Sequence, residues 1–160
     1  MLDFTKFYND LEFVAALYYN NMLTNQDIYD IANKMINSDP DEKLIDILVA
    51  TNETDKNLVK FGEYIKTKNI SFKDPQRFLI KKIFQYILKM DIALSDGIKY
   101  INFKILNSEL TKKYVGDYVG IEQIIGNFWA IEDGDVTDSK NIQILEDLIK
   151  KDMLKYIEEN

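Results

Sequence analysis

Apolar residues recur at intervals of three and four along most of this sequence, which is the spacing of one face of an α-helix. The segment TNQDIYDIANKMIN shows it most clearly, because its apolar positions from Ile28 to Ile36 share one helical face. Thr24 and Asp27 stand three residues apart just before them, which is typical of a capping box. We therefore predict a helix that begins after Thr24.

The same reasoning extends to the rest of the chain. Two Asp-Pro pairs, at Asp39 and Asp74, predict helices in which the aspartate is the N-cap and the proline is the first helical residue. Residues 98–106 suit a helix or a strand, and we favour a helix. Further helices are expected from near Phe4, from near Asp55, between Gly120 and Gly134, and from Asp138 or Ser139.

These patterns predict an all-α fold. We expect a single domain over residues 1–160, built as an irregular bundle of about seven helices. Short helix pairs leave stacked helical hairpins, as in α-solenoids, as the alternative.

Histidine and cysteine are both absent, which narrows the chemistry. A Ser-His-Asp or Cys-His nucleophile is excluded, and so are a Cys/His zinc site and a haem held by His or Cys. We expect a protein that is not an enzyme and needs no cofactor. The start of the sequence lacks the basic segment of a secretion signal, and the run Phe13–Tyr19 is too short to span a bilayer, so we expect a cytoplasmic protein without a membrane partner.

The segment YVGDYVGIEQIIGNFWAIEDGD, residues 114–135, is rich in Gly and Asp and could be a ligand loop. It lacks the Lys-Ser/Thr pair of a phosphate-binding loop. Calcium is the better candidate, because four oxygen-bearing side chains follow the spacing of positions 1, 3, 5 and 12 of an EF-hand, but Lys140 stands at position 6, which needs glycine. We therefore interpret Gly116, Gly120 and Gly134 as helix punctuation. The four side chains are Asp135, Thr137, Ser139 and Glu146.

Charge is segregated along the chain: residues 1–55 carry −8, residues 56–113 carry +8 and residues 114–160 carry −7. The lysine-rich middle, interleaved with aromatic residues, could bind nucleic acid, although an isoelectric point of about 4.7 opposes this. Two acidic clusters could instead dock a basic protein, or they could be solvated helix ends. The first cluster is Asp39, Asp41 and Glu42; the second is Glu132, Asp133, Asp135 and Asp138.

In general character, as an acidic chain rich in Lys, Ile and Asn, the sequence resembles bacterial immunity proteins, and residues 114–135 look like a segment of helical proteins found in such settings. The resemblance implies stoichiometric inhibition of a cognate toxin, often a basic nuclease. The two acidic clusters would then be the candidate contacts, with Tyr118 and Trp129 as possible anchors. A helical adaptor with an apolar groove and a nucleic-acid binder are the alternatives.

Overall fold

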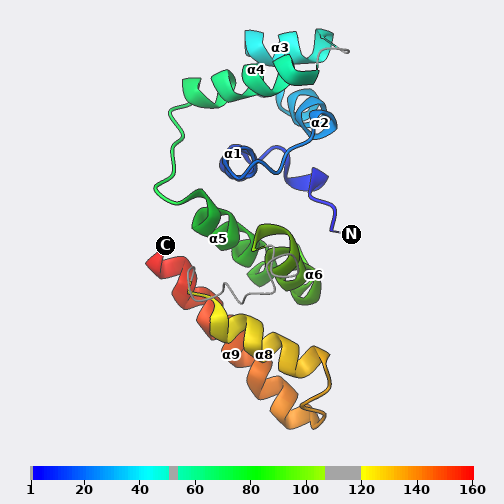
Figure 1. The fold of residues 1–160 in the computed structure, drawn as a ribbon, viewed down its shortest axis with the longest axis vertical. Helices are drawn as coiled ribbons and strands as arrows, with labels where there is room; N and C mark the ends of the chain where they lie inside the picture. Colours follow the sequence, from blue (N-terminus) through cyan, green and yellow to red (C-terminus); the bar gives the residue numbers. More distant parts are fainter. Residues whose placement is uncertain (1, 51–53, 107–119) are drawn as a thin grey trace. The chain divides into compact units, whose positions relative to one another are not determined.

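A computed structural model describes residues 2–50, 54–106 and 120–160, and all regular secondary structure in these ranges is helical (Figure 1). The described residues form eight α-helices, a short 3-10 helix and a π-helical segment, which confirms the predicted all-α fold. The chain divides into two compact units, Asp3–Leu79 and Ile80–Asn160 together with Leu2, and each is described by itself. The single domain expected over residues 1–160 stays a prediction.

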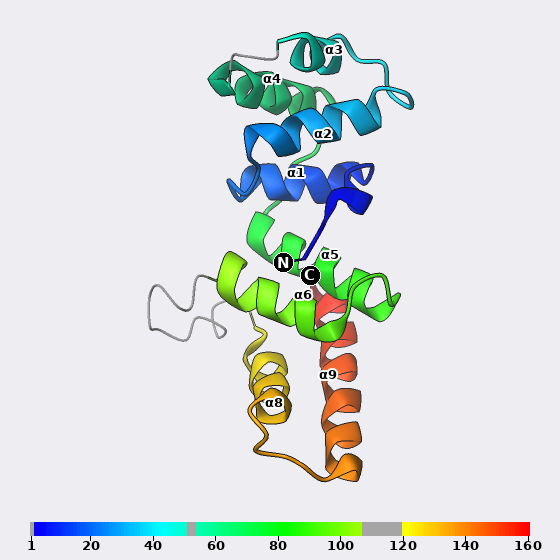
Figure 2. The ribbon, with the colours of Figure 1, turned by 90° about the vertical axis from the view of Figure 1, so that its right-hand side faces the viewer.

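The first unit contains a group of three helices that pack on one another. Helix α2 contacts both α3 and α4, and α3 contacts α4 (Figure 2). Their fully buried side chains include Ile28, Leu44 and Phe61, one from each helix. The elements of this unit are η1 (Thr5–Phe7), α1 (Leu11–Tyr19), α2 (Asn25–Met35), α3 (Glu42–Val49), α4 (Thr54–Thr67) and the start of α5 (Pro75–Leu88).

The capping box predicted at the start of α2 is confirmed. The Thr24 hydroxyl accepts the Asp27 backbone N–H at 3.1 Å, and the Asp27 carboxylate accepts the Thr24 backbone N–H at 2.7 Å. The Tyr8 hydroxyl also donates to Asp27, at 2.6 Å. Burial by itself would raise the pKa of Asp27, but the hydrogen bonds from Thr24 and Tyr8 outweigh it and lower that pKa. The start of α2 therefore also holds the segment before α1.

The prediction that the first helix begins near Phe4 is wrong. Helix α1 begins at Leu11, because the Asp10 side chain caps it by accepting the Phe13 backbone N–H at 3.1 Å. The preceding apolar residues form the separate 3-10 helix η1 and its flanks. The Phe4 ring nevertheless packs on Phe13, with ring centroids 5.2 Å apart. The apolar spacing therefore identified residues that are buried, although these residues do not belong to one continuous helix.

Helix α4 approaches α1 closely at Gly62. A Cβ atom added there would lie 2.1 Å from the Tyr18 hydroxyl oxygen. Beyond Tyr18, the Asn20 side-chain amide donates to the carbonyl of Pro75 at 3.0 Å. The end of α1 thus contacts both α4 and the first residue of α5.

The second unit comprises the rest of α5 followed by α6 (Leu94–Tyr100), a π-helical segment (Ile101–Ile105), α8 (Glu122–Glu132) and α9 (Ser139–Glu159). Residues 98–106 are therefore helical as far as Ile105, as we favoured. Helices α8 and α9 form an antiparallel pair (Figure 2). The cap predicted for α5 is confirmed, since Asp74 accepts the Arg77 backbone N–H at 3.1 Å. Across the described ranges, no helix combines the length and the apolar character needed to cross a membrane.

Two of the glycines interpreted as helix punctuation flank α8. Gly120 and Gly134 have φ angles of +75° and +74°, a region that side chains disfavour. Gly116 lies outside the described residues.

Helix α5 ends in a Schellman motif with an unusual residue in the left-handed position. The Asp91 N–H donates to the Tyr86 carbonyl and the Met90 N–H to the Ile87 carbonyl, both at 2.9 Å. Met90 has a φ of +61° and is 91% exposed. The corresponding positions after α1 and α4 are occupied by Asn21 and Asn69, which tolerate this conformation better.

We expect Met90→Gly to raise the free energy of unfolding by about 0.5–1 kcal/mol. Glycine relieves a left-handed strain of roughly 1–2 kcal/mol, part of which is offset by its greater freedom in the unfolded chain. The exposed Met90 side chain gives up little packing. Urea unfolding measures the change, and Asn21→Gly is the control with a smaller expected gain. An unchanged or lower stability for Met90→Gly would contradict the expectation.

Candidate functional site

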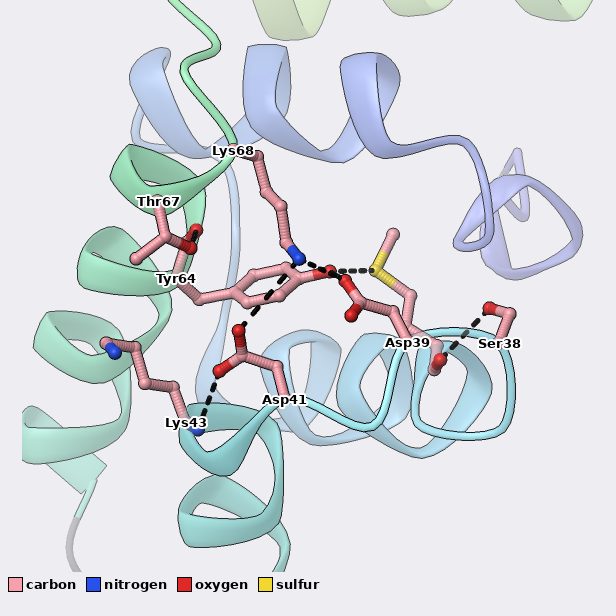
Figure 3. A network of polar contacts seen from close by, with 8 residues as sticks. Ser38, Asp39, Asp41, Lys43, Tyr64, Thr67 and Lys68 are labelled. Carbon is pink, nitrogen blue, oxygen red and sulfur yellow. Dashed lines mark hydrogen bonds and ion pairs between the residues drawn. The ribbon is translucent and has the colours of Figure 1, made fainter.

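The first acidic cluster lies where the chain passes from α2 to α3, and two of its three carboxylates are occupied within the fold (Figure 3). The Tyr64 hydroxyl donates to Asp39 Oδ2 at 2.8 Å, and Lys68 Nζ lies 2.5 Å from the same oxygen. Lys68 Nζ is also 3.9 Å from Asp41 Oδ2 and 5.0 Å from the centre of the Tyr64 ring. Tyr64 lies in the last turn of α4 and Lys68 directly follows that helix, so this network ties the α2–α3 connection to the end of α4.

The environment of this network shifts two pKa values in opposite directions. Hydrogen bonds from Lys68 and then Tyr64 lower the pKa of Asp39, because they favour its charged form. Burial raises the pKa of Tyr64, and the hydrogen bond to Asp39 raises it further. Asp39 is therefore a fixed acceptor for a buried phenol and a lysine, and this internal role competes with partner binding.

The helix start predicted at Asp39 and Pro40 is wrong by two residues. The N-cap of α3 is Asp41, whose Oδ1 accepts the Lys43 backbone N–H at 2.9 Å, and the helix begins at Glu42. Asp39 is drawn to Tyr64 and Lys68 instead, so Pro40 precedes the helix. Within the cluster, only Glu42 is exposed and without an ion pair among the described residues.

The second acidic cluster forms the loop between α8 and α9, and it is more open than the first. Asp133 and Asp135 are exposed on either side of Gly134, and neither has an ion pair within the described part of the chain. The Val136 N–H donates to the Ala130 carbonyl at 3.1 Å, which closes the loop onto the end of α8. Two acidic side chains thus project from a backbone held by its own hydrogen bonds.

The remaining two members of the second cluster have local partners. Glu132 Oε2 lies 2.8 Å from Lys99 Nζ, which links the end of α8 to α6. Asp138 is the N-cap of α9 and accepts the Lys140 backbone N–H at 2.9 Å. The capping role expected near Asp138 is thereby confirmed.

The calcium interpretation of this loop meets a geometric difficulty as well as the unfavourable Lys140. Ser139 and Glu146 belong to α9, so the spacing that suggested an EF-hand runs largely along a helix. Among the described residues, no group of three or more acidic side chains is arranged to hold a metal ion.

Of the two aromatic anchor candidates, Trp129 lies next to the acidic loop. Its ring packs 5.2 Å from that of Phe128 and 5.8 Å from that of Phe103, yet the residue is only half-buried. The Trp129 side chain is therefore held by two neighbouring rings and still has part of its surface exposed to solvent. Tyr118 lies outside the described residues.

A small cleft of about 190 Å³ lies between the start of α8 and the last turns of α9. Ile124 and Tyr156 line it together with charged residues of both signs, including Asp152 and Lys155. Its volume is below the roughly 300–1,000 Å³ of typical small-molecule sites. It was not anticipated from the sequence, because it depends on how α8 packs against α9.

The lysine-rich middle of the sequence is shared between the two units, since the division falls at residue 80. Two of its lysines, Lys68 and Lys99, are ion-paired with the acidic clusters themselves, one in each unit. Part of the opposite charge seen along the sequence is therefore cancelled inside each unit.

Compared with protein families, with curated proteins and with solved structures, the chain gives no significant match.

Proposed function

We propose that this chain is a non-enzymatic protein-binding inhibitor that uses the α8–α9 loop to dock a basic partner. The observation that supports it is the pair Asp133 and Asp135, which are exposed and without an ion pair among the described residues. The first acidic cluster contrasts with it, because Asp39 and Asp41 are engaged with Lys68. The contact residues proposed here are therefore concentrated in the second cluster.

The loop suits recognition because its charges are presented on a preorganised backbone. The Val136 hydrogen bond and the Asp138 cap restrict the loop, so binding orders few residues. Close acidic charges accelerate association with a basic surface and select against acidic competitors. The half-buried Trp129 next to the loop supplies an aromatic anchor of the kind that dominates many interfaces.

Within this class, we propose a bacterial immunity protein that neutralises a cognate toxin by stoichiometric binding. The resemblance in general character supports this choice, as does a loop whose carboxylates could occupy the place of a nucleic acid's phosphates in a nuclease site. Such an inhibitor requires complementary shape and charge and no reactive group of its own.

The test is capture of the partner from the native host with the tagged full chain at low salt, followed by affinity measurements. We expect Asp133→Lys/Asp135→Lys to weaken binding by at least about tenfold. Added salt should also weaken the binding of the wild type, because it screens the attraction between opposite charges. Asp147→Lys/Glu158→Lys changes the net charge equally at exposed sites of α9 and should leave the affinity nearly unchanged.

Two results would overturn the proposal. One is a captured partner that binds the loop variant as tightly as the wild type. The other is a basic toxin, recovered with this chain, whose activity is unaffected by an excess of it.

A further inference from the structure

Two helices expose pairs of apolar side chains spaced four residues apart, although their opposite faces already form the core of their units. On α3 these are Ile45 and Val49, which are 47% and 74% exposed. On α9 they are Ile144 and Leu148, which are 47% and 40% exposed. Side chains four apart lie on the same side of a helix, so each pair forms a short apolar stripe.

The stripe on α3 is flanked by acidic residues. Glu42 and Asp46 are exposed and have no ion pair within the described residues. The side of α3 that packs into the unit is set by the fully buried Leu44 and Ile47. The outer face of α3 is thus apolar towards its end and acidic towards its start.

The stripe on α9 is followed by basic residues. Lys151 and Lys155 stand one and two turns beyond Leu148, and both are exposed. Lys155 makes only a long, exposed contact of 3.8 Å with Glu159, which contributes little. Asp147, the acid nearest to the stripe, accepts a hydrogen bond from the Gln143 amide at 3.0 Å.

We propose that the outer face of α3 in one copy of this chain docks on the outer face of α9 in a second copy. Antiparallel helices that place Ile45 beside Leu148 and Val49 beside Ile144 also place Glu42 level with Lys151. Apolar side chains then meet apolar ones, and Glu42 and Lys151 bring opposite charges together at one end of the contact. Asp46 lies level with Asp147 in this register, and the Gln143 amide holds the Asp147 carboxylate on its own helix.

This contact is heterologous, because each copy offers one face of each kind. Such contacts leave a free face at both ends of a pair and form rings or open chains. A face of two apolar and two charged side chains is smaller than a standard interface of roughly 800 Å² per partner, so the association is weak and appears only at high concentration.

Sedimentation velocity of the full chain, from low micromolar to near-millimolar concentration, tests the proposal. The wild type should show a sedimentation coefficient that rises with concentration. Glu42→Lys and Lys151→Glu should each abolish the rise, since each places two like charges where Glu42 and Lys151 would meet. An equimolar mixture of the two variants should restore it, because each variant then offers a face complementary to the other's. Lys150→Glu, an exposed charge on another side of α9, is the control and should associate like the wild type.

A wild-type sedimentation coefficient that stays at the monomer value throughout would overturn the proposal. The proposal would also be overturned if each variant alone associated as strongly as the wild type. The same holds if the mixture of the two variants associated no more than either variant alone. Circular dichroism confirms that each variant is folded, and the mixture itself shows whether the reversed faces remain competent. None of these substitutions touches Asp133 or Asp135, so the result is independent of the proposed inhibitor function.

Discussion

Gly97→Ala is expected to lower the free energy of unfolding by about 2 kcal/mol, even though alanine favours helix by about 1 kcal/mol over glycine. The added Cβ atom would lie 2.4 Å from Ile87 Cδ1 and 2.9 Å from Ile87 Cγ1, with Ile83 Cγ2 at 3.5 Å. Ile83 and Ile87 are buried, so neither can swing into solvent to make room. Helices α5 and α6 would have to move apart, which gives up packing along their contact. Urea or thermal unfolding of the two proteins measures the difference.

The matched control is Gly126→Ala, because Gly126 lies inside α8 and nothing stands within 4 Å of the position its Cβ would occupy. There only helix propensity changes, and the variant should gain about 0.5–1 kcal/mol. Adding Ile87→Val to Gly97→Ala removes one of the clashing atoms and should recover part of the loss. If Gly97→Ala is as stable as the wild type, then the close approach of α5 and α6 does not require glycine at position 97.

Helix starts that depend on nearby residues were predictable from the sequence. The Thr24 cap, the Asp74-Pro75 start and the Asp138 cap are each made by atoms within three residues of one another. A cap of this kind satisfies backbone N–H groups that lack a partner in any helix, so its chemistry is the same whatever surrounds it. Apolar spacing, likewise, identified most of the residues that are buried.

The Asp39-Pro40 start looked identical to the Asp74-Pro75 start and failed for a reason that lies far away in the sequence. Tyr64 is 25 residues from Asp39, and it approaches only because α2 and α4 pack together. A buried phenol needs an acceptor, which outweighs the modest gain from an exposed N-cap. No local pattern around Asp39 contains that information.

The two acidic clusters were equivalent candidates for the same reason. Their composition is alike, and what separates them is the placement of lysines distant in sequence. Lys68 reaches Asp39 and Asp41, whereas in the second cluster Lys99 reaches Glu132 and leaves Asp133 and Asp135 exposed. Which carboxylates face solvent is decided by helix packing, which the charge pattern along the chain does not record.

Asp39→Ala is expected to lower the free energy of unfolding by about 1–2 kcal/mol at neutral pH. It removes the acceptor of the Tyr64 hydroxyl and the partner of Lys68, and the buried Tyr64 is left with only the distant Met35 sulfur at 3.8 Å. A hydrogen bond to a charged group contributes roughly 1.5–3 kcal/mol. The expected loss is smaller here because the Asp39 side chain is 35% exposed, so solvent screens its charge. Denaturant unfolding at pH 7 measures the loss.

The same network makes the stability fall in acid, and the direction follows from the lowered pKa of Asp39. Because the unfolded chain binds this proton more readily than the folded chain, the contribution is fully present above about pH 5 and is lost as the pH falls through the folded pKa. The stability difference between the wild type and Asp39→Asn should therefore be largest at neutral pH and shrink steadily below pH 4. Asp46→Asn removes an exposed acid of α3 outside the network and controls for net charge. A difference between wild type and Asp39→Asn that is equal at neutral and acid pH would mean that the charge of Asp39 does not stabilise the contact with α4.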